Sequence, residues 1–220
     1  MIDDLFRSPQ TRRMIFKLGD NALVLQNFLT EKQTQAMIKD IINIINIVPF
    51  RYMFTPSGHQ MSVAMTSCGD FGWITDNKGY RYTRVDPLTN TSWPKIPSSF
   101  YRLACQAAEH VGFINFNPNA CLINEYTETS KMSLHQDKDE KNLNAPIVSF
   151  SLGLPALFLW GGLNKSDKVV KVRLQHGDVV VWGGVDRLRF HGIASIASGS
   201  HSELGRKRIN LTFRQVQRSF

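Results

Sequence analysis

Two stretches in the first half of the chain have apolar residues at the spacing of an amphipathic helix. Thr30 followed three residues later by Gln33 predicts an N-cap with a capping box, and Pro49 marks the predicted end of that helix. A second helix is predicted over about residues 98–111, with Gly112 as its stop signal. The side chains expected to face the core are Ala36, Met37, Ile41, Ile42 and Ile45 in the first helix, and Phe100, Leu103, Ala104 and Ala107 in the second.

Elsewhere the chain consists of short apolar or alternating runs separated by turn residues, which is typical of β-strands. Strands are predicted at residues 22–29, 61–66 and 80–83 before the second helix, and at residues 120–126, 147–152, 156–160, 169–174, 179–182 and 208–216 after it. Residues 1–20 read as a polar N-terminal lead-in. The order of elements predicts an α+β, mainly β fold: a sandwich or jelly roll with helices covering one face, in a single domain over residues 1–220.

The composition is that of an ordinary globular protein with a basic balance. The 26 Lys and Arg residues exceed the 18 Asp and Glu residues and give a net charge of +8. This charge favours a polyanionic partner such as nucleic acid, although a merely basic, soluble protein is an open alternative. Three widely spaced cysteines form neither a disulfide framework nor a zinc cluster, and no apolar run suggests a signal peptide or a membrane span. We therefore expect a cytoplasmic protein without membrane association, and nothing suggests more than a monomer.

Aromatic and basic residues alternate between residues 51 and 84. Trp73, Tyr80 and Tyr82 lie among Arg51, Arg81 and further cations. Such a segment suits a surface that stacks bases and neutralises phosphates, but it also suits an ordinary β-hairpin. The pattern alone leaves the two readings open.

The motif S-L-H-Q-D-K-D-E places His135 and Asp137 two residues apart, so that both project to one side of an extended segment. His191, after a valine-rich strand and a Trp-Gly-Gly turn, supplies a candidate third ligand. Two histidines and one carboxylate with open positions form the facial triad of non-haem Fe(II) oxygenases. A lone histidine is more often structural, and His176-Gly177-Asp178 has the same H-x-D spacing. That second motif precedes a buried-looking strand and is better explained as a tight turn.

The last predicted strand carries Arg208 and Arg214 on one face, because their separation of six residues is even. An open Fe(II) site requires a chelating co-substrate such as a 2-oxo acid, whose far carboxylate needs a cationic partner. Two inward arginines would be costly to bury without anions, so an outward, solvated face is the alternative. We favour the inward orientation, because the intervening apolar residues can pack against the helices.

Several ordered motifs resemble those of the AlkB family, Fe(II)- and 2-oxoglutarate-dependent dioxygenases that repair alkylated nucleic acid bases. The motifs are M-S-V-A-M-T-S-C-G, G-W-I-T-D-N-K-G-Y-R-Y, N-E-Y, S-L-H-Q-D-K-D-E, A-P-I-V-S-F-S-L-G-L-P-A, H-G-D-V-V-V-W-G-G, R-F-H-G and R-I-N-L-T-F-R. The resemblance covers most of the chain from about Thr55 and is closest to the bacterial subgroup acting on DNA. It implies a double-stranded β-helix over about residues 120–217, a nucleotide-recognition lid over about residues 50–92, and covering helices.

The resemblance also implies roles for individual residues. The implied iron ligands are His135, Asp137 and His191, which are catalytic together with Arg208. The implied 2-oxoglutarate residues are Arg208, Asn124, Tyr126, Asn210 and Arg214. The implied base-binding residues are Met65, Trp73 and Asp139, and the implied strand-binding residues are Thr55, Tyr80, Lys131, Gln136, Lys138 and Lys165. Lys165 stands where close relatives carry arginine and lacks the planar fork of that side chain. Residues 198–207 differ from the relatives, and no role is assigned to them.

The implied reaction is oxidative demethylation of bases such as N1-methyladenine and N3-methylcytosine in DNA. It is coupled to decarboxylation of 2-oxoglutarate to succinate, consumes O2 and releases formaldehyde. A base that cannot pair is cheap to extrude, so single-stranded DNA or a flipped-out base is the expected substrate. The alternatives are the same chemistry on RNA and a non-catalytic β-domain that binds nucleic acid. Such a binding domain would need neither the triad nor Arg208.

Overall fold

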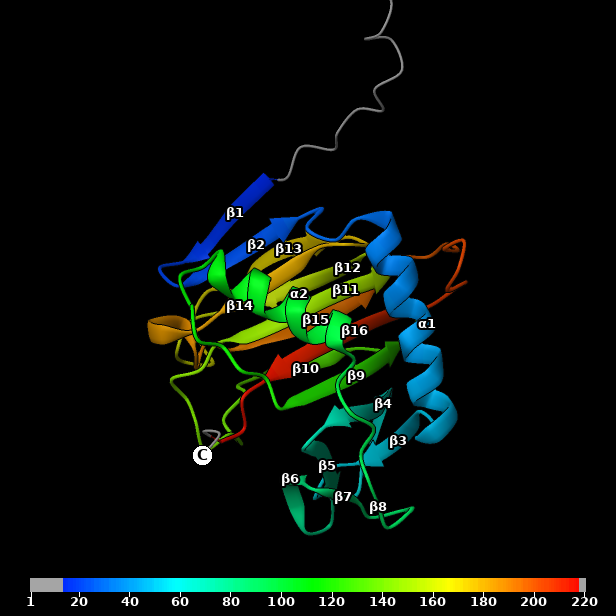
Figure 1. Ribbon diagram of the computed structural model, residues 1–220. Helices are drawn as coiled ribbons and strands as arrows, with labels where there is room; N and C mark the ends of the chain where they lie inside the picture. Colours follow the sequence, from blue (N-terminus) through cyan, green and yellow to red (C-terminus); the bar gives the residue numbers. More distant parts are fainter. Residues whose placement is uncertain (1–13, 218–220) are drawn as a thin grey trace, which may run out of the picture.

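The computed structural model describes residues 14–217, which form two helices, a short 3-10 turn and a set of β-strands (Figure 1). The elements before the second long helix are β1 Met14–Gly19, β2 Ala22–Gln26, α1 Glu31–Ile47, β3 Arg51–Phe54, β4 Gln60–Gly69, β5 Gly72–Asp76, β6 Gly79–Thr83, β7 Val85–Asp86 and β8 Thr91–Ser92. Those that follow are α2 Ser98–Glu109, β9 Ala120–Tyr126, β10 Met132–His135, β11 Ile147–Gly153, β12 Ala156–Trp160, β13 Val170–Leu174, β14 Val179–Trp182, η1 Gly184–Asp186, β15 His191–Ile196 and β16 Arg208–Arg214.

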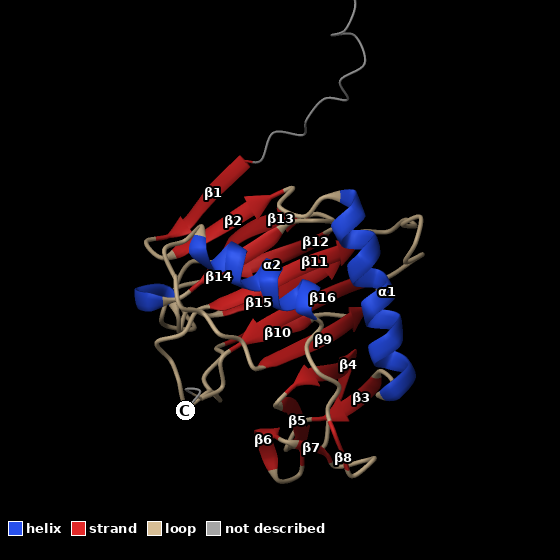
Figure 2. Cartoon of the chain, in the orientation of Figure 1, coloured by secondary structure: helices blue, strands red, loops and turns tan. Residues whose placement is uncertain are grey.

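The strands form a large sheet, a smaller sheet and two hairpins. The large sheet has the order β1-β2-β14-β11-β16-β9-β4-β3, and the small sheet has the order β10-β15-β12-β13. Both long helices cover the same face of the large sheet (Figure 2). The hairpins β5–β6 and β7–β8 lie together below the large sheet in Figure 1, beside β3 and β4. The arrangement confirms the expected mainly β jelly roll with covering helices.

Two hydrophobic cores result from this layering. One lies between the helices and the large sheet, where Met37 and Phe100 pack with Leu211 and Phe213 of β16. The other lies between the two sheets and includes Trp182 of the large sheet. Because side chains alternate along a strand, β16 contributes its apolar residues to the first core and turns its polar residues toward the small sheet. The inward orientation of Arg208 and Arg214 is thereby confirmed.

The predicted helix start is also confirmed, because the Thr30 side chain accepts a hydrogen bond from the Gln33 backbone and Gln33 completes the capping box. The predicted stripe of α1 is partly wrong. Met37 and Ile41 are buried, but Ala36 is exposed and Ile42 is 48% exposed. The buried face is completed instead by Thr34, Ile38 and Ile44. Adjacent isoleucines allow two overlapping stripes, and contact with the sheet selects one of them.

The expectation of a polar lead-in over residues 1–20 is wrong for its last part, whereas residues 1–13 lie outside the described region. Met14–Gly19 forms β1, the edge strand of the large sheet, paired with β2. Its three consecutive apolar residues Met14, Ile15 and Phe16 are all largely exposed, so apolar and polar residues do not alternate here as they do in a half-buried strand.

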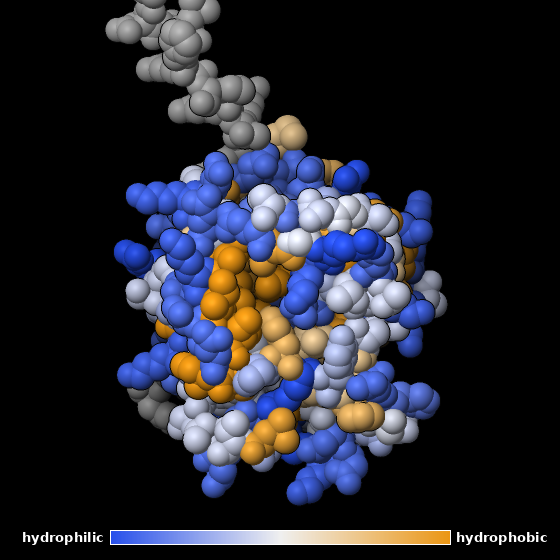
Figure 3. Space-filling model, turned by 90° about the vertical axis from the view of Figure 1, so that its right-hand side faces the viewer, coloured by the Kyte–Doolittle hydropathy of each residue, from blue (hydrophilic) through white to orange (hydrophobic). Residues whose placement is uncertain are grey.

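Among the described residues, no helix is both long enough and apolar enough to cross a membrane. The side that faces the viewer in Figure 3 has a hydrophobic hollow bordered by hydrophilic residues.

Candidate functional site

Strand pairing in the small sheet brings the two candidate histidine ligands together. His135, the last residue of β10, lies directly opposite His191, the first residue of β15, in the antiparallel register. Residues directly opposite each other project to the same face of a sheet with their Cβ atoms about 5 Å apart. The strands approach so closely that a Cβ on Gly192 would lie 2.5 Å from the Met132 carbonyl oxygen. Glycine is therefore required beside His191.

The predicted triad forms one cluster. His135 Nε2 lies 3.6 Å from Asp137 Oδ1, and His191 Nε2 lies 3.7 Å from Asp137 Oδ2. One ligand atom from each of the three residues lies within 4.8 Å of the others. A single cation could therefore contact all three side chains, which line the cavity.

Hydrogen bonds to backbone carbonyl groups orient both imidazoles. His135 Nδ1 lies 2.9 Å from the Ser133 carbonyl oxygen, and His191 Nδ1 lies 3.1 Å from that of Arg189. A carbonyl can only accept, so each Nδ1 carries the proton and donates it. Each Nε2 then keeps its lone pair for a metal, which is the usual arrangement around protein metal sites.

The electrostatics of the triad favour the forms that bind cations. Burial, together with the neighbouring His135, lowers the pKa of His191 to about 4, so this imidazole is neutral at pH 7. Burial alone would raise the pKa of Asp137, but the positive charge of Arg214, which donates to Asp137 Oδ2 at 2.7 Å, lowers it below its ordinary value. The site thus offers two neutral nitrogen donors and one anionic oxygen, a donor set that suits Fe(II).

A buried guanidinium faces the same cavity with most of its hydrogen-bonding capacity unused. Arg208 is completely buried, and Nη2 donates to Ser151 Oγ at 2.9 Å, while Nε and Nη1 have no hydrogen-bond partner in residues 14–217. Burial lowers its pKa to about 10, which leaves it charged at pH 7. A buried, unpaired charge is costly unless an anion joins it. The free nitrogens fit the far carboxylate of a 2-oxo acid.

The polar residues around Arg208 are held to different degrees. The Tyr126 hydroxyl donates to the Met132 sulfur, a weak acceptor at 3.8 Å, and burial raises the pKa of this tyrosine to about 12. This hydroxyl therefore remains a protonated donor for a ligand. Asn210 is fixed by a hydrogen bond to Ser149 Oγ at 2.7 Å, whereas Asn124 Oδ1 is buried with no partner among the described residues. Together these groups form a polar wall beside the triad.

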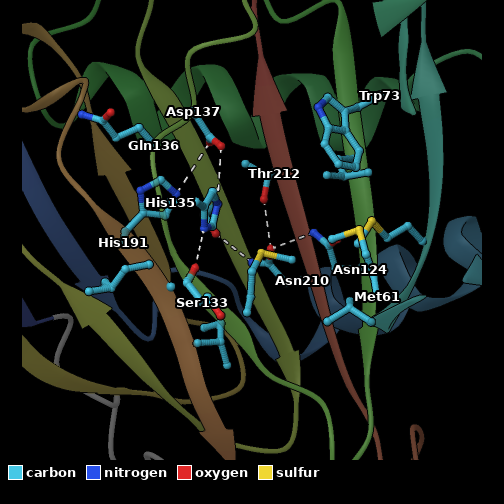
Figure 4. Close-up of a pocket in the computed structure, with 18 of the residues that line it drawn as sticks. Met61, Trp73, Asn124, Ser133, His135, Gln136, Asp137, His191, Asn210 and Thr212 are labelled. Atoms are coloured by element: carbon cyan, nitrogen blue, oxygen red, sulfur yellow. Dashed lines mark hydrogen bonds and ion pairs between the residues drawn. The ribbon is translucent and has the colours of Figure 1, made fainter. Parts of the chain in front are cut away.

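The triad, Arg208 and the polar wall of Tyr126, Asn210 and Asn124 line one cavity of about 670 Å³ (Figure 4). Of the residues predicted to bind metal, co-substrate or nucleic acid, it brings together Thr55, Met65, Trp73, Tyr80, Asn124, Tyr126, Lys131, His135, Gln136, Asp137, Lys138, Asp139, His191, Arg208, Asn210 and Arg214. Lys165 is the exception, because it lies on the exposed loop between β12 and β13 and does not line the cavity.

The wall opposite the triad is aromatic. Trp73 stacks on Tyr80 with ring centroids 5.7 Å apart, and Figure 4 shows Trp73 across the pocket from His191. Trp73 Nε1 donates to Asp139 Oδ2 at 2.9 Å. Asp139 therefore fixes the indole as well as carrying the negative charge expected near the base. A flat ligand can enter between this aromatic wall and the triad.

The cations of the 51–84 segment do not all face a ligand. Arg51 is paired with Asp86 at 2.8 Å, and Arg81 is paired with Asp76 at 2.7 Å. These two arginines are therefore already paired with carboxylates of the predicted lid, and nucleic acid binding by the basic and aromatic residues of this segment stays a prediction. The lysines Lys131 and Lys138 are exposed at the cavity and form no ion pair with any residue that the structure describes.

Sequence reasoning missed the residues that support the site. Ser151 holds Arg208, and Arg187 donates to the Asp137 carbonyl oxygen at 2.5 Å and to Glu140 at 2.8 Å. Glu140 belongs to the S-L-H-Q-D-K-D-E motif, but no role was expected for it. Arg187 lies four residues before His191, and no spacing rule marks it, since its partners come from another segment.

Comparisons with known proteins agree with this geometry. A model of the 2OG-Fe(II) oxygenase superfamily matches residues 21–214. The chain is 51% identical to the alpha-ketoglutarate-dependent dioxygenase AlkB of Salmonella typhimurium and 50% identical to that of Escherichia coli, in each case over 90% of this chain and 92% of the relative. The solved structure of OsALKBH1 is similar with a TM-score of 0.80 and 30% identity, over 92% of this chain and 100% of that one.

Proposed function

The chain belongs to the AlkB family of the 2OG-Fe(II) oxygenase superfamily, and on that premise we propose that it repairs N-alkylated bases in DNA by oxidative dealkylation. As a dioxygenase of this family it uses Fe(II), 2-oxoglutarate and O2. One observation carries the proposal for this chain. A two-histidine, one-carboxylate cluster, an unpaired buried arginine and an aromatic wall line the same cavity.

The proposed metal ligands are His135, Asp137 and His191, with Arg208 as the partner of the far carboxylate of 2-oxoglutarate. The distances within the triad and the two unused guanidinium nitrogens support these roles. Asn124, Tyr126, Asn210 and Arg214 complete the proposed co-substrate pocket. With Fe(II) and 2-oxoglutarate held by these residues, the site would supply oxidative chemistry: one oxygen atom of O2 would enter succinate, formed with CO2 from 2-oxoglutarate, and the other would be inserted into a C–H bond of the alkyl group, so that a hydroxylated methyl group leaves as formaldehyde.

The protein holds the base against this centre. We expect Trp73 to stack on the extruded base, with Met65 beneath it and Asp139 near its exocyclic amino group. N1-methyladenine and N3-methylcytosine are cationic, so a carboxylate beside them is electrostatically favourable. Both lesions block base pairing, and this lowers the cost of extrusion. Holding the alkyl group in line with the metal reduces the entropic cost of the reaction.

The remaining strand-binding roles are assigned to the residues around the cavity mouth. Thr55, Tyr80, Lys131, Gln136 and Lys138 line the cavity, and the exposed lysines carry charge available for phosphates. Lys165 is proposed to meet a more distant part of the strand, since it lies outside the cavity. We expect a monomer that acts on single-stranded DNA or a flipped-out base in the cytoplasm. The lid over about residues 50–92 and the catalytic core over about residues 120–217 would form one domain.

The second candidate substrate is RNA. The stacking wall and the unpaired lysines suit either nucleic acid, because base faces and phosphates are common to both. Matched DNA and RNA oligonucleotides with a single N1-methyladenine or N3-methylcytosine, incubated with Fe(II), 2-oxoglutarate and O2, distinguish them by formaldehyde release. Faster release from DNA supports the proposal, and faster release from RNA replaces the substrate. Release from neither would refute dealkylation of these lesions.

A further inference from the structure

A buried carboxylate joins the aromatic wall to the metal-ligand segment. Glu140 is 6% exposed, and its two oxygens accept hydrogen bonds from two side chains and form an ion pair with a third. Oε1 accepts from the Tyr82 hydroxyl at 2.6 Å and lies 3.2 Å from Arg214 Nε, while Oε2 accepts from Arg187 Nη2 at 2.8 Å. These partners come from β6, from β16 and from the loop before β15.

The first branch of this network reaches the base-binding wall. Tyr82 lies directly opposite Trp73 in the β5–β6 register, so both side chains project to the same face of the hairpin. Tyr80, which stacks on Trp73, lies on that face as well. The hydrogen bond from Tyr82 to Glu140 therefore anchors the hairpin close to the stacking residue itself.

The second branch reaches the metal ligand by two routes. Arg214 donates to the Asp137 carboxylate at 2.7 Å, and Arg187 donates to the Asp137 backbone carbonyl at 2.5 Å. Arg187 also donates to the Ala145 carbonyl oxygen at 3.0 Å, which ties this guanidinium to the chain entering β11. Asp137 is thus held at both its side chain and its backbone.

We propose that Glu140, Arg187 and Tyr82 are positioning residues that set the distance between the stacking residue Trp73 and the metal ligand Asp137. This inference rests on the proposed function, because it concerns the fit of the base to the metal centre. Glu140 and Arg187 connect the two walls of the cavity, and the Tyr82 hydroxyl bonds the hairpin to Glu140 beside the hydrogen bond from Trp73 to Asp139. A purely structural ion pair would not need to end on the metal-ligand segment and on the partner of Trp73.

The decisive variant is Tyr82→Phe, which removes one hydroxyl and keeps the ring. We expect kcat/KM for a methylated oligonucleotide to fall roughly tenfold, since hydrogen bonds to charged groups are among the stronger ones in proteins. We also expect more succinate per formaldehyde, because a loosely held base allows 2-oxoglutarate to be consumed without dealkylation. The visible absorption of the anaerobic Fe(II)–2-oxoglutarate complex should remain, as Asp137 and Arg208 are untouched.

A matched control is Tyr101→Phe, because the Tyr101 hydroxyl donates to Asn117 at 3.0 Å on the exposed side of α2, away from the cavity. This variant should keep the wild-type succinate-to-formaldehyde ratio. In a double-mutant cycle, adding Tyr82→Phe to Glu140→Gln should produce less than its single effect, because both changes break the same bond. If Glu140→Gln does not fold, the comparison of Tyr82→Phe with Tyr101→Phe still decides.

The outcomes distinguish a failure of the positioning role from a failure of the proposed function. An active wild type in which Tyr82→Phe matches Tyr101→Phe in kcat/KM and in the product ratio overturns the positioning role. A wild type that forms no Fe(II)–2-oxoglutarate absorption and releases no formaldehyde overturns the proposed function instead. A Tyr82→Phe variant that loses the absorption band would show that the hydroxyl supports the metal site rather than the fit of the base.

Discussion

Replacement of Arg208 by methionine should have opposite effects on the free protein and on its complex with 2-oxoglutarate. In the free protein Arg208 is completely buried, bonds only Ser151, and forms no ion pair with any described carboxylate. Exchanging a buried charge for an apolar side chain of similar volume is often neutral or stabilising by about 1–4 kcal/mol. For a chain of this size that corresponds to a rise in Tm of roughly 2 °C or more.

The complex should lose more binding free energy for 2-oxoglutarate than the free protein gains in free energy of unfolding. Two guanidinium nitrogens are available to the carboxylate, and each charge-assisted hydrogen bond contributes about 1.5–3 kcal/mol. Their loss corresponds to a Kd for 2-oxoglutarate weaker by roughly 10²- to 10⁴-fold. Arg208→Lys keeps the charge without the fork and should lie between the wild type and Arg208→Met.

Thermal unfolding under anaerobic conditions with Fe(II), with and without 2-oxoglutarate, measures both effects. Ligand at a hundred times Kd stabilises the wild type by about 2.7 kcal/mol, and at the same ligand concentration this increment should fall to about 0.4 kcal/mol or less in Arg208→Met. Arg173→Met is a suitable control, because Arg173 is exposed on β13 and has no ion pair among the described residues. A free protein destabilised by several kcal/mol, or a retained 2-oxoglutarate increment, would refute the assignment of Arg208 as the carboxylate partner.

Three further outcomes are expected. Asp137→Ala should abolish the Fe(II)–2-oxoglutarate absorption and formaldehyde release, and retention of either would remove the aspartate from the metal site. Trp73→Ala should raise KM for a methylated oligonucleotide by roughly 5- to 150-fold, because base stacking contributes about 1–3 kcal/mol. The absorption of the Fe(II)–2-oxoglutarate complex should not change, and an unaltered KM would contradict stacking. Burial and the neighbouring His201 lower the pKa of His176, so the folded protein binds a proton at this residue less readily than the unfolded chain does. The free energy of unfolding should therefore fall as pH drops below about 6.5. His176→Gln should weaken this pH dependence, which denaturant titrations at several pH values measure.

The sequence was most informative where a local pattern had a single structural solution. The alternation of β16 left only the choice of face, and burying Ile209, Leu211 and Phe213 against the helices decided it. The H-x-D spacing predicted that His135 and Asp137 project to one side, but it also occurs at His176 and Asp178, so the spacing alone did not select the cluster with His191. In α1, by contrast, neighbouring isoleucines satisfied two phases of the helix, and only the sheet determined that Ile42 faces solvent.

The pairing of charges could not be predicted from the sequence, because the partners come from distant segments. Arg51 and Arg81 looked available for phosphates, but Asp86 and Asp76 neutralise them. Arg187 carried no signal, although it holds Asp137 and Glu140. Residue type shows that a charge exists, whereas the strand register decides whether that charge is already paired.

This distinction separates two parts of the cavity. In the network around Glu140, the carboxylates of Asp137 and Glu140 balance the guanidinium groups of Arg187 and Arg214, so buried charge is neutralised before any ligand arrives. Arg208 has no such partner, and its charge is neutralised only when an anion enters. The paired part can hold its geometry without ligand, because separating its charges in a low-dielectric site is costly. Fe(II) adds two positive charges and 2-oxoglutarate adds two negative ones, so together they leave the net charge of the cavity unchanged, while the far carboxylate would give Arg208 a local partner.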